Sequence, residues 1–265
     1  MKRFCMRFYL ALAFVFLYTP ILILIVLSFN DSRVRSSWGG FTLKWYAQLF
    51  SDATLLTALK NTLSIALISA GIASLIALMA ALGVDAMRKN HAVVVINLGN
   101  IPVLNADIVT GIILMLTMGR FMKLGYASIL IAHITFNIPY VFLSVLPAIK
   151  NCNRSVYEAA RDLGADAGTA FFRVLLPDIM PSLMGGFFMA VTLSMDDFVV
   201  TYFTRGAGID TLSTLIYGQL KRGLKPEMYA LSSMIFFVVL LILIAGNLIP
   251  GGAKRRDNDA VWKRI

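Results

Sequence analysis

The sequence predicts an all-α integral membrane protein with six transmembrane helices. Hydrophobic residues make up 58% of its 265 residues and charged residues only 14%, and the mean hydropathy is +0.78. Soluble domains are about half apolar and about a quarter charged. The apolar residues also come in long blocks, and about 20 apolar residues are enough for a helix to cross the hydrocarbon layer of a bilayer.

Six segments have the required length. Four of them lack Asp, Glu, Lys and Arg, the third contains only Asp107, and the fifth contains the adjacent pair Asp196 and Asp197. The first segment follows a basic start and is not followed by a small-x-small cleavage site, so we expect an uncleaved span and not a signal peptide. The predicted spans are 8–29, 61–84, 92–118, 126–149, 179–204 and 228–253.

The distribution of Lys and Arg predicts the topology. An even number of spans places both termini on one side, and basic residues are denser in the segments that a cytoplasmic N-terminus puts inside the cell. We therefore expect both termini in the cytoplasm. Cys5 and Cys152 then lie on the reducing side and are predicted to be free thiols. The formal charge of +10 reflects topology and contact with anionic lipids more than nucleic-acid binding.

Several local patterns predict how the spans pack. Small residues at four-residue spacing in the second span predict close helix packing within the chain. Pro102 and Pro139 predict kinks in the third and fourth spans, and His133 is expected to be a buried, hydrogen-bonded packing residue. An aromatic-rich segment before the second span predicts a short helix at the outer membrane surface. The small residues are Ala66, Ala70, Ser74, Ala73, Ala77 and Ala81; the aromatic residues are Trp38, Phe41, Trp45, Tyr46 and Phe50.

The longest predicted inner loop carries signals for two short helices. Ser155 and Glu158 have the spacing of a capping box that starts a helix, and Gly164 is expected to end it. Asp166 can cap a second short helix, which Pro177 leads into the fifth span. Apolar residues share one face of the first helix, namely Val156, Ala159, Ala160 and Leu163. A docking surface for a soluble partner and a connector lying on the membrane are both compatible with this pattern.

The same loop resembles the EAA loop of ABC-importer permeases. Its matching residues are Glu158, Ala159, Ala160, Gly164, Val174, Leu176 and Pro177. The resemblance implies a type I ABC importer permease fold, in which loop 155–177 is a cytoplasmic coupling helix that docks on an ATPase subunit. The chain itself lacks a G-x-x-x-x-G-K-[ST] phosphate loop. We therefore expect a non-catalytic subunit without metal or cofactor, whose partner ATPase binds ATP-Mg.

Four further stretches resemble one branch of that family, the spermidine/putrescine importer permeases, and specifically the second of their two permease subunits. They are NADIVTGI (105–112), AHITFNIPYV (132–141), LSMDDFVV (193–200) and PEMYAL (226–231). The resemblance covers roughly 8–250, although Asn105-Ala106 replaces an expected Ser-Pro pair. It implies a bacterial cytoplasmic-membrane complex with a second permease, an ATPase homodimer and an extracytoplasmic substrate-binding protein.

The resemblance also divides the chain. We expect a first span with an outer interfacial segment, a transporter core of five helices, and a basic cytoplasmic tail. Their residues are 1–57, 58–253 and 254–265.

The carboxylates within the predicted spans are candidate cargo ligands. A charged side chain at the centre of the bilayer costs about 2.5–3.5 kcal/mol on insertion scales. A polyamine needs acceptors that replace its lost water, and carboxylates on a pathway wall can provide them. Asp196 and Asp197 are equally compatible with capping a helix at a break. The family resemblance favours cargo contact for at least one of this pair and leaves both interpretations open for Asp107.

Tyr217 lies in the predicted loop before the last span, and its ring can stack on an ammonium group. A solvated loop that touches the binding protein is the alternative interpretation.

Other classes of protein fit the sequence less well. An intramembrane aspartyl protease would use Asp107 and Asp196, but their Ala-Asp and Met-Asp contexts lack the sequence signatures of those enzymes. A proton-coupled secondary transporter often has inverted repeats, which the sequence does not display, and would have no use for the coupling loop. An ABC permease for another small solute remains the main alternative to polyamine transport.

Overall fold

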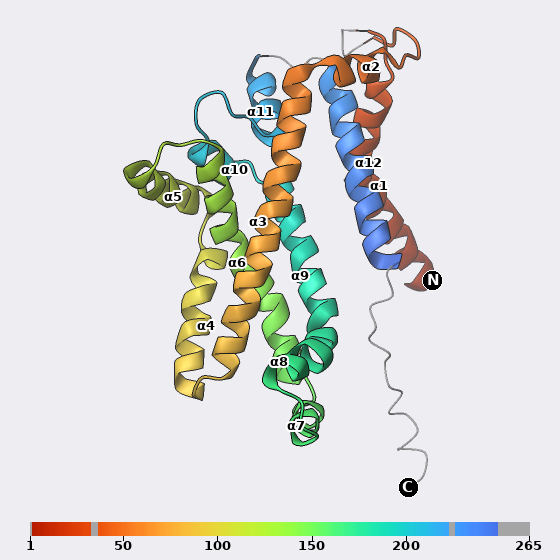
Figure 1. Ribbon diagram of the computed structural model, residues 1–265. Helices are drawn as coiled ribbons and strands as arrows, with labels where there is room; N and C mark the ends of the chain where they lie inside the picture. The colour runs from red at the N-terminus through yellow and green to blue at the C-terminus, as the bar shows by residue number, and fades with distance from the viewer. Residues whose placement is uncertain (1, 33–36, 223–225, 249–265) are drawn as a thin grey trace. The chain divides into compact units, whose positions relative to one another are not determined.

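The computed structural model describes residues 2–32, 37–222 and 226–248. The regular elements within these ranges are helices, and an isolated antiparallel bridge pairs Asn30 with Phe41. In chain order the elements are α1 (Lys2–Ser28), α2 (Lys44–Ser51), α3 (Ala53–Asp85), α4 (Lys89–Leu104), α5 (Asp107–Phe121), α6 (Tyr126–Asn151), α7 (Arg154–Asp162), α8 (Ala167–Ala170), the π-helix η1 (Phe171–Leu175), α9 (Leu176–Asp196), α10 (Val199–Thr204), α11 (Leu212–Arg222) and α12 (Pro226–Leu248) (Figure 1).

The chain forms two compact units, which are described separately. The first unit contains 1–60 and 210–249, and the second contains 61–209 and 250–265. The division therefore falls inside α3.

The described residues contain four helices that are long and apolar enough to cross a membrane. They are Met6–Ser28, Ala53–Asp85, Tyr126–Asn151 and Ala167–Asp196. A bent pair of helices, Lys89–Leu104 and Asp107–Phe121, counts as a fifth span if it crosses the membrane once. The predicted sixth span coincides with α12 as far as Leu248, and its last five residues, 249–253, lie outside the described residues. The chain is thus a multi-pass membrane protein, and the sixth span stays a prediction.

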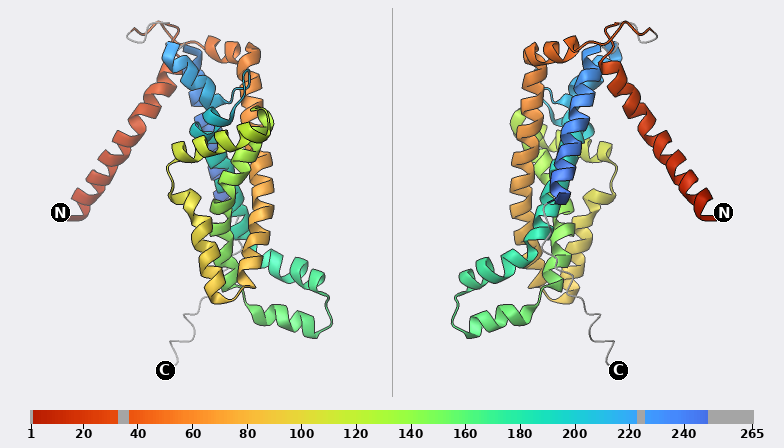
Figure 2. Two further views of the ribbon diagram at one scale, coloured as in Figure 1. Left: turned by 90° about the vertical axis from the view of Figure 1, so that its left-hand side faces the viewer. Right: turned by 90° about the vertical axis from the view of Figure 1, so that its right-hand side faces the viewer.

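The third predicted span is two helices and not one kinked helix. α4 and α5 are bent by 102° (Figure 2). The break lies at Asn105 and Ala106, which both adopt extended backbone conformations, while Pro102 lies inside α4. Asparagine is a poor helix former, and the carboxylate of Asp107 stabilises the positive end of the new helix that begins with it.

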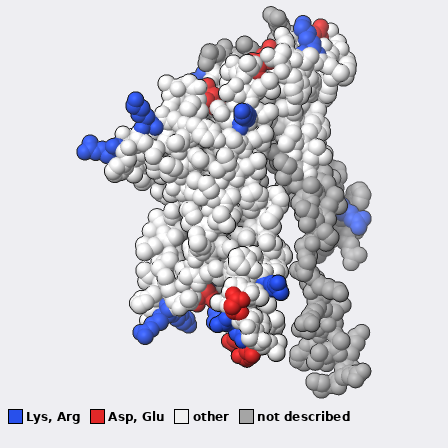
Figure 3. Space-filling model, in the orientation of Figure 1, with Lys and Arg blue, Asp and Glu red and all other residues white. Residues whose placement is uncertain are grey.

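On the face that Figure 3 shows, charged side chains lie toward the upper and lower parts of the molecule, and a band of uncharged residues lies between them. This is the distribution expected when apolar helices cross the hydrocarbon layer and charges stay at its edges.

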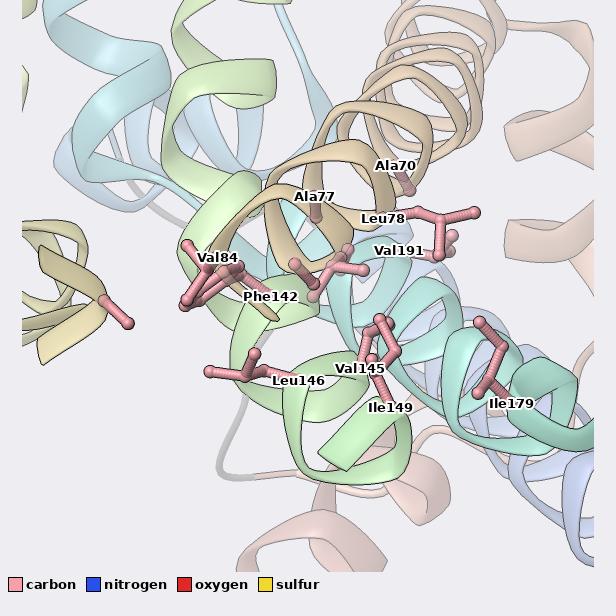
Figure 4. Packing of buried hydrophobic residues seen from close by; sticks show 14 of the residues in the cluster. Ala70, Ala77, Leu78, Val84, Phe142, Val145, Leu146, Ile149, Ile179 and Val191 are labelled. Carbon is pink, nitrogen blue, oxygen red and sulfur yellow. The ribbon is translucent and has the colours of Figure 1, made fainter. Parts of the chain in front are cut away.

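The core of the second unit lies between α3, α4, α6 and α9. Ala66, Ala70, Ala77 and Ala81 of α3 have no exposed surface and pack in one cluster with residues of α6 and α9, part of which Figure 4 shows. Ala73 and Ser74 are buried as well. The predicted small-residue packing within the chain is therefore confirmed. Small side chains allow helix backbones to approach closely where lipid supplies no hydrophobic driving force.

The contact between α6 and α9 is equally close. A Cβ atom on Gly186 of α9 would lie 3.1 Å from both Ser144 Cβ and Val141 Cγ1 of α6. Ser144 Oγ donates a hydrogen bond of 2.8 Å to the Ser182 carbonyl oxygen. These two helices form the frame on which the broken spans are held.

The first unit is tied together by two aromatic side chains of α2. Trp45 Nε1 donates to the Asn30 carbonyl oxygen at 2.7 Å, and the Tyr46 hydroxyl lies 2.7 Å from both Ser28 Oγ and Ser233 Oγ. The predicted short helix is thus confirmed. Trp45 is packed inside the unit, because its side chain is only 2% exposed and its indole N–H finds a partner there; the interfacial position of the segment stays a prediction.

The loop between α6 and α9 folds into a helical hairpin, in which α7 packs against α8 and η1 (Figure 2). The N-cap of α7 is Asn153, whose side chain accepts a hydrogen bond from Ser155 N, so the predicted capping box starting at Ser155 is wrong. Asparagine and serine are both common N-cap residues. Here Asn153, the one nearer the end of α6, caps the helix. Asp166 caps α8, as predicted, by accepting from Gly168 N and Thr169 N.

Gly164 ends α7 as predicted. Its φ is +91°, a conformation that glycine adopts without steric penalty. The Gly164 amide donates to the Arg161 carbonyl and the Ala165 amide donates to the Ala160 carbonyl, which is the bonding pattern of a Schellman motif. Helices α8, η1 and α9 then follow one another directly, with Pro177 in the first turn of α9.

We expect Gly206→Ala to destabilise the protein. A Cβ atom at this position would overlap the Leu124 carbonyl oxygen and lie 2.8 Å from its carbon, so backbone must move, at about 1–3 kcal/mol. Thermal unfolding of the purified protein in detergent measures this. Gly119→Ala is the matched control because a Cβ atom there meets nothing within 4 Å; equal melting temperatures for the two variants would contradict the prediction.

Candidate functional site

The carboxylates within the spans lie at helix breaks. Asp107 is the first residue of α5 and its side chain is exposed. Asp196 is the last residue of α9, and Asp197 follows it in an extended conformation before α10 begins. The helix of the predicted fifth span over 179–204 therefore ends at Asp196, and the break that was one of the two alternatives for this pair of residues is present. Asp107 lies at the start of a helix and not in the middle of one.

Asp197 caps α10. Its carboxylate accepts hydrogen bonds from Val200 N at 3.2 Å and from Thr201 N at 2.8 Å, and also from Thr201 Oγ1 at 2.9 Å. Its side chain is only 7% exposed. The first N–H groups of a helix lack acceptors within the helix. The Asp197 carboxylate is the acceptor for two of these groups in α10. Of the two interpretations of this residue, the cap is the one that the geometry supports.

Asp196 is in a different environment. Its side chain is exposed, and within the described part of the chain it has no side-chain hydrogen bond or ion pair. The two neighbouring carboxylates therefore differ chemically: Asp197 is occupied by the protein's own donors, whereas Asp196 is available to an outside cation.

The helices that follow the two breaks pack against each other. A Cβ atom on Gly111 of α5 would lie 3.0 Å from Phe203 Cδ2 and 3.4 Å from the Val199 carbonyl oxygen, both in α10. Figure 1 shows α5 and α10 side by side, in agreement with their contact. The two broken spans are thus packed together through α5 and α10.

His133 of α6 lies behind the second break. It is 1% exposed; its Nδ1 lies 2.6 Å from Ser194 Oγ and its Nε2 lies 2.9 Å from Thr201 Oγ1. The expectation of a buried, hydrogen-bonded histidine is confirmed. Its partners on α9 and α10 could not be inferred from the sequence.

Tyr140 of α6 packs its ring on Phe136, one turn earlier in the same helix, with centroids 5.2 Å apart. An i, i+4 aromatic pair of this kind is explained by packing within the span.

Tyr217 belongs to the first unit, in α11. The ammonium group of Lys221 lies 4.7 Å from its ring centroid, so the ring already contacts a cation of the chain. This geometry is consistent with the predicted ability of Tyr217 to stack on ammonium groups.

The residues of the EAA-like motif lie on the hairpin and at the start of α9. α7 has no buried residue, and the apolar side chains of Val156 in this helix and of Leu163, its C-cap, are 52% and 90% exposed. Glu158, Ala159 and Gly164 are exposed, Ala160 and Leu176 are half-buried, and Pro177 is exposed. An exposed apolar face on a short, well-capped helix is typical of a docking surface.

Two contacts hold the base of this hairpin. Arg154 donates to Asp85 at the end of α3 at 2.7 Å, and Cys152 Sγ donates to Asp178 Oδ2 at 2.9 Å. Burial, followed by the hydrogen bond to Asp178, raises the pKa of the Cys152 thiol to about 11.

Cys152 is a free thiol as predicted, and the side chain of Cys5 lies outside the described residues. The described residues contain no group of three His, Cys, Asp or Glu that could hold a metal ion.

We expect Asp197→Ala to lower the free energy of unfolding by about 1–2 kcal/mol, because the first turn of α10 loses its cap. Asp196→Ala, with an exposed carboxylate, should leave stability nearly unchanged. Thermal unfolding of both variants in detergent provides the test. A destabilisation by Asp196→Ala equal to that of Asp197→Ala would refute the assignment of the cap to Asp197.

Comparison with known proteins identifies the family. Residues 94–251 match the family described as "Binding-protein-dependent transport system inner membrane component". The chain is 38% identical to the spermidine/putrescine transport system permease protein PotC of Escherichia coli, over 89% of this chain and 90% of that protein. It is 33% identical to the E. coli putrescine transport system permease protein PotI, over 94% and 92% of the two chains.

A solved structure supports the fold. The structure resembles a chain of a bacterial ABC transporter involved in the import of the acidic polysaccharide alginate, with a TM-score of 0.70, 18% identity and coverage of 94% of each chain. The broken helices, the helical hairpin, the matching family model and these relatives all agree. The chain therefore belongs to the family of binding-protein-dependent transport system inner-membrane components, the permeases of ABC importers, and within it to the PotC-like group.

Proposed function

We propose that this chain is one of the two permease subunits of an ATP-driven importer of polyamines such as spermidine and putrescine. The observation that carries the proposal is its 38% identity to PotC along nine-tenths of both chains. The geometry of the site agrees, because two exposed carboxylates, Asp107 and Asp196, lie at breaks in apolar spans.

The chemistry of the carboxylates suits a cationic cargo. A polyamine is a flexible chain of ammonium groups that loses its water in a narrow pathway, and ionised acceptors replace that water. Several separated sites of modest strength release the cargo more readily than one deep site. In this proposal Asp107 and Asp196 contact the cargo and Tyr217 stacks on an ammonium group, while Asp197 shapes the pathway by holding the break.

We further propose that the hairpin docks on an ATPase homodimer, which binds ATP-Mg. The exposed apolar side chains Val156 and Leu163 provide the contact surface. The motif residues Glu158, Ala159, Ala160, Gly164, Leu176 and Pro177 then transmit closure of the ATPase to α9, which follows η1 directly. The permease itself performs no chemistry.

The remaining assembly follows from the family. A second permease subunit completes the pathway, an extracytoplasmic binding protein delivers the cargo, and both termini lie in the cytoplasm. Residues 58–253 form the transporter core, 1–57 the first span with its outer segment, and 254–265 a basic tail.

An ABC permease for another small solute is the alternative. The structural neighbour that imports alginate illustrates that this fold does not determine the cargo. An anionic cargo, however, would be repelled by the exposed carboxylates Asp107 and Asp196.

We expect labelled spermidine and putrescine, but not a neutral sugar, to enter proteoliposomes that contain the complete complex and ATP. Asp107→Asn and Asp196→Asn should each raise the apparent KM about ten-fold or more, since a hydrogen bond to a charged group contributes about 1.5–3 kcal/mol. Asp31→Asn, outside the predicted spans, is the matched control.

Each contrary result has a distinct meaning. Absence of polyamine uptake by the wild type would refute the cargo, and unchanged KM values in both variants would refute the carboxylate pathway. Uptake without ATP that follows a proton gradient would indicate a secondary transporter.

The docking surface predicts a second effect. Leu163→Glu places a charge on the exposed apolar face of α7 and should reduce co-purification of the ATPase at least ten-fold. Ser155→Glu adds the same charge at the first turn of α7, about 90° round the helix from the centre of that face, and should have a smaller effect. Quantitative pull-down from detergent extracts distinguishes the two; equal retention of the ATPase by both variants would argue against docking on this face.

A further inference from the structure

A chain of buried polar side chains crosses the second unit behind the break between α9 and α10. Its members come from α3, α6, α9 and α10 and are at most 4% exposed. They are Ser69, His133, Asn137, Ser194 and Thr201. Polar groups buried among apolar helices must find partners, so the hydrogen bonds among them can be followed from one residue to the next.

The bond between Thr201 and Asp197 sets the direction of the chain. An ionised carboxylate only accepts hydrogen bonds, so Thr201 Oγ1 donates to Asp197 Oδ2 at 2.9 Å. Because a hydroxyl has only one proton, Thr201 Oγ1 must accept from His133 Nε2, which lies 2.9 Å away. The Nε2 atom of His133 therefore carries a proton.

The other ring nitrogen of a neutral histidine is then an acceptor. It lies 2.6 Å from Ser194 Oγ, which donates to it. Ser69 Oγ lies 3.4 Å from Ser194 Oγ and accepts from Asn137 Nδ2 at 3.2 Å. The bonds from Ser194 through His133 and Thr201 thus all donate toward the carboxylate at the break, while Ser69 Oγ donates to the Ala66 carbonyl oxygen at 3.3 Å.

His133 is the only residue of this chain that bonds to both sides of the break, among the residues that the structure describes. Ser194 lies in α9 and Thr201 lies in α10, while Asp197 and Phe198 between these helices belong to neither. Where the helical backbone ladder is interrupted, side-chain bonds set the relative direction of the two helices. Asp196, with its exposed carboxylate, is the last residue before this joint.

We infer that His133 is a positioning residue for transport: by bridging Ser194 and Thr201 it fixes the break and thereby the direction of the Asp196 carboxylate. The inference rests on the proposed function insofar as Asp196 contacts the cargo. A positioning role differs from a simple packing role. Packing needs only the volume of the imidazole ring, whereas positioning requires a hydrogen-bond donor at Nε2 and an acceptor at Nδ1.

Three substitutions separate these requirements. His133→Leu fills space without hydrogen bonds. In His133→Gln the amide nitrogen reaches about as far as ring Nε2 and preserves the bond to Thr201. In His133→Asn the amide oxygen lies about where Nδ1 lies and preserves only the bond from Ser194.

The first measurement is polyamine uptake by the complete complex, in a double-mutant cycle with Asp196→Asn. We expect His133→Leu to raise the apparent KM about ten-fold in the wild-type background, and His133→Gln and His133→Asn, which each keep one of the two bonds, to raise it by a smaller factor of about three-fold. In the Asp196→Asn background, His133→Leu should have no further effect on KM, since the carboxylate that it positions is absent. An equal increase of KM in both backgrounds would overturn the inference.

The second measurement does not depend on the cargo. Asp196→Cys, in a complex from which Cys5 and Cys152 are removed, is labelled with a cationic methanethiosulfonate reagent. We expect His133→Leu to change the labelling rate at least three-fold and His133→Gln, which keeps the bond to Thr201, to change it by a smaller factor. Thr192→Cys, one turn earlier on the exposed side of α9, should keep its rate in all variants.

These outcomes distinguish the two hypotheses. A wild-type complex that imports no polyamine refutes the proposed function, and the labelling rates still decide the position of residue 196. Labelling at residue 196 that is unaffected by His133→Leu refutes the positioning residue, whatever the cargo.

Discussion

The structure depends on the need to satisfy backbone N–H groups inside a membrane. No water is available in the hydrocarbon layer, so a helix that breaks there must find other partners for its freed groups. At the second break these partners are the carboxylate oxygens of Asp197, which bind two amides and one hydroxyl of α10. The same charge that is unfavourable in lipid makes a broken span possible, and the break in turn creates an exposed neighbour, Asp196.

The close packing of α3, α6 and α9 in the second unit surrounds the two breaks with protein. Alanine and glycine at the contacts of α3, α6 and α9 bring the three backbones close together, and α5 and α10 pack against each other at Gly111. Interruptions in apolar spans occur where they are buried in protein or line a polar cavity. The permease therefore combines a tightly packed frame with two short helices whose starts carry the acidic residues.

Much of the fold could be predicted because it follows from local patterns. Long apolar blocks predicted the main helices, alanine spacing predicted the buried face of α3, and Gly164 and Asp166 predicted the limits of the hairpin helices. The break at Asp197 was one of two alternatives that the adjacent carboxylates suggested, whereas the break at Asn105 was not predicted, because apolar residues on both sides of it fit one continuous span. Burial of Trp45 and the partners of His133 depend on residues distant in sequence, so no local signal could reveal them.

The π-helix between the hairpin and α9 has a consequence for the spacing of the family motif. A π-turn closes on the fifth residue and not the fourth, so Phe171–Leu175 shifts the phase of everything that follows. Each residue contributes about 100° of rotation in an α-helix, and Ile179, Gly186 and Ala190 are buried in the phase that results. One residue between Gly164 and Pro177 is thus taken up by the π-turn: the loss of one residue from Phe171–Leu175 would let this turn close as an ordinary α-turn and keep the inward side of α9 in place.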